Sequence, residues 1–144
     1  MTPFSLRIFV ADSDPDGLRI VERSNCVGRA LVFPRLAMAQ PSVATRPELQ
    51  QTGVYLLLGP REDGEGDRLY IGEGDPIKPR LATHYSGKDQ KDFWTRAICF
   101  VSMGQVLNKA HVLAMLPVVG RSANGRVDWK DPQGRALKVL QKIN

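Results

Sequence analysis

Cysteine and histidine are scarce in this chain of 144 residues. The two cysteines, Cys26 and Cys99, stand far apart and lack CxxC spacing, so neither a disulfide framework nor a zinc site is expected. The two histidines, His84 and His111, form no metal-ligand cluster in the sequence. Both cysteines are therefore expected to be small apolar residues packed in the fold.

Long hydrophobic runs are also absent. No apolar stretch approaches the roughly 18 residues that would span a bilayer, so no membrane partner is expected. The N-terminal stretch contains Arg7, and acidic residues follow closely, which favours a strand over a signal peptide and predicts a cytoplasmic protein. With 42% apolar and 24% charged residues, the composition is typical of a globular protein of about one domain.

Lysine is missing from residues 1–75, and glutamate is missing from residues 76–144. Residues 1–75 carry 8 Arg against 11 acidic residues, a net charge of −3, whereas residues 76–144 carry 12 Lys and Arg against 4 Asp, a net charge of +8. A basic half suits a polyanionic partner, because Lys and Arg release counterions when they bind phosphates. Charge of this size is also common for solubility alone, and by itself it favours that explanation.

The hydrophobic pattern predicts an α/β (α+β) chain: an N-terminal β-meander, further strands and helices, and a C-terminal strand–helix appendage. Three expected parts follow, an N-terminal β region (1–46), a central domain (47–119) and a linker with an accessory segment (120–144). Strands are expected at 6–11, 18–22, 29–35, 53–59, 68–72, 93–102 and from 127; helices at 75–85, 106–116 and the C-terminus. Asp75 is the expected N-cap of the helix at 75–85, with Pro76 at its first position.

Two glycine-bearing strands and a helix supply the main motif. "GVY" stands at 53–55, "YIG" at 70–72, Arg80 lies ten residues after Tyr70, and His84 follows four residues later on the same helix face. This ordered set resembles the GIY-YIG nuclease family, over residues 47–112. The stretches 6–22 and 32–35 resemble a short N-terminal region of one bacterial branch, and residues 127–141 are similar to an accessory module of some members.

The resemblance implies an α/β (α+β) fold with a small central antiparallel sheet flanked by helices. It also implies roles in phosphodiester hydrolysis. Tyr55 would act as general base or position the attacking water, and Tyr70 would orient that water or the phosphate. Arg80 would stabilise the charge on the phosphate through its planar guanidinium, and His84 would assist proton transfer or contact the phosphate.

Other residues are candidates for contact with the substrate. Gly72, like Gly53, would let the backbone and the substrate approach closely. Lys88 and Lys91 flank the expected substrate face and would contact the DNA backbone, although a solvated charge run explains them equally well. Phe93 and Trp94 are expected in the core.

The family also implies a divalent cation, Mg²⁺ or Mn²⁺, held by a glutamate on the helix after the third strand. That glutamate aligns with Leu116, and no glutamate follows Glu73 in the chain. The metal ligand is therefore unknown, with Glu73 as a weak substitute.

Three functions remain open from the sequence. The first is a GIY-YIG-type endonuclease that hydrolyses DNA, with single- or double-stranded DNA unresolved. The second is a catalytically inactive relative that binds nucleic acid through the same groove. The third is a protein-interaction module in which the tyrosines are core residues.

Overall fold

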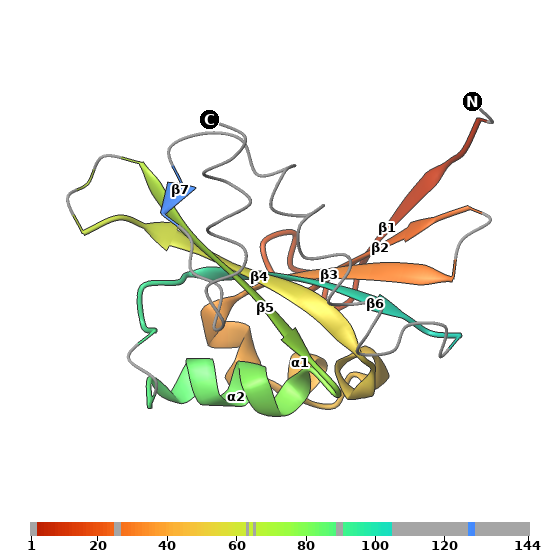
Figure 1. Cartoon of the computed structure of the whole chain (residues 1–144). Coiled ribbons are helices and arrows are strands. Elements are labelled where there is room, and N and C mark those ends of the chain that lie inside the picture. The colour runs from red at the N-terminus through yellow and green to blue at the C-terminus, as the bar shows by residue number, and fades with distance from the viewer. Residues whose placement is uncertain are drawn as a thin grey trace, which may run out of the picture.

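The computed structural model describes residues 3–24, 27–62, 64, 66–88 and 91–104, and the backbone of 127–128. One sheet of seven strands runs through these residues in the order β1-β2-β3-β6-β4-β5-β7 (Figure 1). The strands are β1 (Leu6–Val10), β2 (Arg19–Arg23), β3 (Gly28–Pro34), β4 (Gly53–Pro60), β5 (Asp67–Gly74), β6 (Arg96–Ser102) and β7 (Val127–Asp128). Neighbouring strands are antiparallel except β5 and β7, which are parallel. The predicted α+β class with a central antiparallel sheet is confirmed.

Two α-helices and two 3₁₀ helices are described: η1 (Arg35–Ala39), α1 (Pro41–Ala44), η2 (Pro47–Gln50) and α2 (Lys78–Ser86). Figure 1 shows α1 and α2 on the same side of the sheet. Pro41 and Pro47 each occupy the first turn of a short helix, where a missing N–H costs little.

The N-terminal meander and the central strands form one continuous sheet. β3 pairs with β6 from Gly28 opposite Ser102 to Pro34 opposite Arg96. The three-part division of the chain stays a prediction. The strand expected at 127 is confirmed as β7, whereas the helices expected at 106–116 and at the C-terminus, and the linker at 120–126, lie outside the described residues.

The main core lies between the helices and the sheet. Because strand side chains alternate, every second residue of β3, β4 and β6 faces the helices, and the apolar residues of this set are buried. Val54 and Tyr55 are neighbours on β4, so their side chains project from opposite faces, and both are 0% exposed. Both faces of the sheet are therefore covered at this point, whereas Leu56 and Leu58 farther along β4 are half-buried. Cys99 and Trp94 are also buried in this core, as predicted.

Helix α2 begins later than the sequence pattern predicted. It starts at Lys78, and Ile77 rather than Asp75 occupies the N-cap position. The physical reason is tertiary: the Ile77 side chain is fully buried and its N–H donates to Gln51 O at 3.2 Å. Asp75 instead accepts a hydrogen bond from Thr52, so its carboxylate is used away from the helix.

Candidate functional site

The register of β4 and β5 brings the two motif tyrosines together. Tyr55 lies opposite Gly72, and Tyr70 lies opposite Leu57, so both tyrosine side chains project from the same face of the sheet. Their ring centroids are 6.2 Å apart. The two motif strands therefore present their phenols side by side.

Helix α2 adds an imidazole to this pair. The Tyr55 hydroxyl and His84 Nε2 are 2.7 Å apart in a buried hydrogen bond. The His84 ring centroid lies 5.5 Å from that of Tyr55 and 5.1 Å from that of Tyr70, nearly edge-on to the latter. These three residues are named the Tyr–Tyr–His cluster below.

Gly72 is required by the position of the Tyr55 ring. A Cβ on Gly72 would lie 2.4 Å from both Cζ and Oη of Tyr55, far inside van der Waals contact. The phenol thus passes directly over the backbone of the facing strand. The glycine of the second motif thus makes room for a protein side chain, and its close approach to a substrate stays a prediction.

The cluster lies inside the fold. Tyr55 is 0% exposed, and Tyr70 and His84 are each 2% exposed. Burial raises the pKa of Tyr55 well above its usual range, and the neighbouring Tyr70 raises it further, while the nearby Arg80 guanidinium opposes both effects. Tyr55 is therefore a neutral phenol that can donate one hydrogen bond and accept others.

Arg80 is exposed on α2, one turn before His84. Burial lowers the pKa of Arg80, but charge and hydrogen-bond interactions with Tyr55 and Tyr70 outweigh this effect, so the pKa is raised overall. The guanidinium thus lies beside both hydroxyls and carries a permanent charge. Among the described residues, Arg80 forms no ion pair with a carboxylate.

The two lysines occupy different positions relative to the cluster. Lys91 Nζ lies 4.9 Å from the centroid of the Tyr70 ring, a cation–π distance. Lys88 is exposed just beyond Gly87, the left-handed residue that ends α2. Two cationic side chains, Arg80 and Lys91, therefore converge on Tyr70, and Lys88 lies farther along the chain.

The described part of the site does not suit a divalent metal. Mg²⁺ prefers carboxylate, carbonyl and water oxygens, whereas the cluster offers two phenols, an imidazole and neighbouring cations. Glu73 cannot complete it, because it alternates with Gly72 on β5 and projects from the opposite face of the sheet. The described residues contain no group of three or more His, Cys, Asp or Glu side chains that could hold a metal ion. Leu116 lies outside them.

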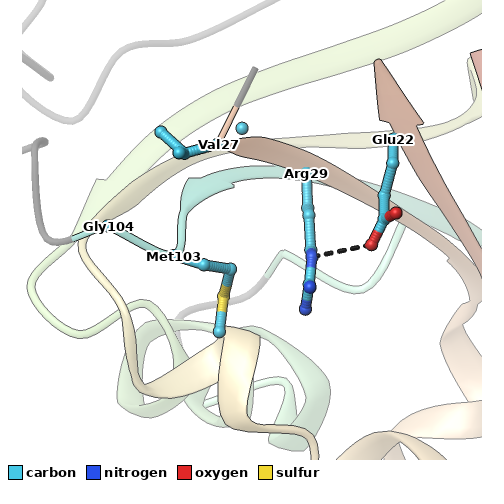
Figure 2. A pocket seen from close by; sticks show the side chains of 6 residues that line it. Glu22, Val27, Arg29, Met103 and Gly104 are labelled. Atoms are coloured by element: carbon cyan, nitrogen blue, oxygen red, sulfur yellow. Dashed lines mark ion pairs between the residues drawn. The ribbon is translucent and has the colours of Figure 1, made fainter. Parts of the chain in front are cut away.

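A separate pocket of about 360 Å³ lies near the ends of β2, β3 and β6 (Figure 2). Arg29 projects into it, but its Nε pairs with Glu22 at 2.9 Å and its NH1 group with Glu48 at 3.2 Å. Arg46 also binds Glu48, at 2.6 Å. This arginine–glutamate network neutralises the charges of the pocket. Sequence reasoning missed the network, whose only local signal is the closeness of Arg46 and Glu48 in the chain.

Comparisons with protein-family models, curated proteins and solved structures found no match to this chain. The resemblance to the GIY-YIG family therefore stays a prediction from the motif residues of the sequence. No helix among the described residues is long and apolar enough to cross a membrane. The cytoplasmic location stays a prediction.

Proposed function

We propose that this chain is a GIY-YIG-type protein that binds DNA through the phosphate backbone, with Arg80 as the main contact. The observation that carries this proposal is the position of Arg80: an exposed guanidinium beside the two tyrosine hydroxyls of a buried, hydrogen-bonded cluster. A guanidinium held in this way presents a planar fork that matches phosphate oxygens.

The buried cluster acts as the support for this contact. Tyr55 is fixed by its bond to His84 and by the close approach of Gly72, so its hydroxyl has little freedom to move. Arg80 is attached to the same helix as His84 and interacts with both phenols. A contact group supported by rigid neighbours loses less conformational entropy on binding than one on a free side chain.

Lys91 and Lys88 extend the positive charge beyond Arg80. Lys91 lies over Tyr70, and Lys88 is exposed at the end of α2. Each phosphate contact on duplex DNA contributes a slope of about −0.9 to a plot of log affinity against log salt concentration. Three contacts therefore predict a slope between about −2 and −3.

The test is a fluorescence anisotropy titration of labelled single- and double-stranded DNA at several salt concentrations. Arg80→Gln is expected to weaken binding to any sequence and to make the salt slope shallower by about one. Arg96→Gln is the matched control, because Arg96 is also exposed but projects from the opposite face of the sheet. Equal losses in the two variants would show that only net charge matters and would contradict the proposed site.

DNA cleavage is a second candidate function, favoured by the Tyr55–His84 hydrogen bond. A phenol bonded to an imidazole is a pair through which a proton can pass. The wild type should be incubated with DNA in Mg²⁺ or Mn²⁺ beside Tyr55→Phe, which removes the hydroxyl, and Leu116→Glu, which places a carboxylate where the family has one. Cleavage by the wild type that Tyr55→Phe abolishes supports a nuclease. Binding without cleavage supports the DNA-binding function. The absence of both binding and cleavage supports a protein-interaction module.

A further inference from the structure

We infer that β1 is a dimerisation edge: two copies of this chain pair antiparallel through β1, centred on Ile8. This proposal goes beyond the proposed DNA-binding function and does not depend on it. It rests on the exposure of β1, on the direction of its backbone groups and on the self-complementarity of its sequence.

β1 exposes apolar side chains on both of its faces. All five of its residues are exposed, and the apolar ones reach 60% exposure at Leu6, 63% at Ile8 and 56% at Phe9. Most of the large exposed hydrophobic residues of the described chain fall between Phe4 and Val10. Such a cluster on one strand is typical of an interaction surface.

β1 is also an edge strand without the usual protection. It lies at the end of the strand order, and its only partner among the described strands is β2 (Figure 1). Natural edge strands are commonly protected by lysine, proline, a bulge or an inward-pointing charge. β1 has an unbroken register with β2 and contains a single charged residue, Arg7.

The backbone groups that point outward can be assigned from the pairing with β2. Ala11 N–H donates to Leu18 O, and Ser24 N–H donates to Ser5 O, so residues 5 and 11 direct their polar groups toward β2. Antiparallel pairs alternate between hydrogen-bonded and non-hydrogen-bonded positions. Residues 5, 7, 9 and 11 therefore face β2, whereas Leu6, Ile8 and Val10 direct their N–H and C=O groups away from it.

These outward groups fit a second copy when Ile8 lies opposite Ile8. In this register Leu6 of one copy lies opposite Val10 of the other, so every outward N–H and C=O of β1 finds a partner. The side chains of these residues form a continuous apolar row on one face, where neighbouring strands gain from cross-strand contact.

The same register also gives Arg7, the charged residue of β1, a favourable partner. Arg7 of one copy lies opposite Phe9 of the other, so its guanidinium meets an aromatic ring, a favourable cation–π pair. A register centred on Arg7 would place two guanidinium groups opposite each other and is disfavoured. A register centred on Phe9 would leave Leu6 beyond the paired residues of the other β1. The centre at Ile8 is thus the one that satisfies backbone, apolar and charged groups together.

The test is the mass of the full chain in solution, measured by sedimentation equilibrium up to roughly 500 micromolar, a range that captures weak association. The wild type is expected to form dimers. Ile8→Lys places two ammonium groups opposite each other and is expected to weaken the dimer at least about tenfold. Leu36→Lys is the matched control, since Leu36 is 77% exposed on η1 and is expected to leave dimerisation unchanged.

A second pair of variants tests the register. Phe9→Glu places a carboxylate opposite Arg7 of the other copy and is expected to preserve or strengthen the dimer, most clearly at low salt. Phe9→Arg places a like charge there and is expected to weaken it. Circular dichroism confirms that each variant is folded. A monomeric wild type, a dimer insensitive to Ile8→Lys, or equal effects of the two Phe9 variants would overturn the proposal.

Discussion

Gly72 offers a direct test of how the cluster is built. In Gly72→Ala the new methyl group would lie 2.4 Å from Cζ and Oη of Tyr55. The ring has little room to retreat, because it is 0% exposed and contacts Tyr70 and His84. Overpacking of this kind costs about 1–3 kcal/mol. Loss of the Tyr55–His84 hydrogen bond would add about 1–3 kcal/mol, so the variant is expected to lose about 2–6 kcal/mol of unfolding free energy.

A double-mutant cycle distinguishes displacement of the phenol from general strain. Tyr55→Phe alone is expected to cost about 1–3 kcal/mol, because the partner atom on His84 remains buried. If Gly72→Ala already breaks the bond, Tyr55→Phe should cost close to nothing in that background. The sum of the unfolding free energies lost in the two single variants would then exceed the loss in the double variant by about 1–3 kcal/mol.

The assay is equilibrium unfolding in urea, with Gly17→Ala as the matched control. A methyl group on Gly17 would meet the carboxylate of Asp12 at 2.7 Å, and this partly exposed side chain can rotate away. Both variants make the same glycine-to-alanine change in the unfolded chain, so the comparison removes that contribution. Strictly additive losses, or a loss for Gly72→Ala no larger than that for Gly17→Ala, would refute this account of the cluster.

Three further results are expected from unfolding measurements. Because the pKa of Tyr55 is raised in the folded state, only the unfolded chain loses this proton above about pH 10, so stability should fall there by up to about 1.4 kcal/mol per pH unit; an equally steep fall in Tyr55→Phe would contradict this. Glu48→Gln should cost about 1–3 kcal/mol at neutral pH, less than a fully buried pair, because Arg29 and Arg46 are 34% and 27% exposed. Burial raises the pKa of Glu48, but hydrogen bonds from Arg46 and Arg29 outweigh it, so the pKa is lowered overall. The wild type should therefore lose this stability as pH falls below about 4.5. An equal loss of stability at acid pH in Glu48→Gln would count against the network. Gly87→Ala should lose about 1 kcal/mol of unfolding free energy, because φ of Gly87 is +72° at the end of α2, although no atom lies within 4 Å of the added methyl group. An unchanged stability would argue against this left-handed end of α2.

Much of the sheet could be predicted from local patterns. The run "VYLLL" lacks polar alternation, and β4 indeed lies between two paired strands. The spacing of Arg80 and His84 placed both on α2, and the structure brings His84 to Tyr55. Periodicity and motif spacing therefore located the elements and the partners of the cluster.

Tertiary contacts decided what the sequence could not show. The start of α2 is set by bonds from Ile77 to Gln51 and from Thr52 to Asp75, which join segments about 25 residues apart. The pairing of β3 with β6 is likewise a long-range contact, with no local signal. Burial of Tyr55 follows from this packing, so the sequence could predict a phenol near an imidazole but not that solvent is excluded from both.

Because β4 is a central strand, the two parts of the site should open at different rates. β4 has a neighbour on each side along most of its length, and its amide protons should be among the slowest to exchange with heavy water. The backbone of Tyr55 should therefore become accessible only when most of the sheet opens, whereas its partner His84 lies on α2, outside these central strands. Arg80 and Lys91 also lie outside these strands, on α2 and on the segment after it, so substitutions there should change the proposed binding of DNA and leave the sheet as it is.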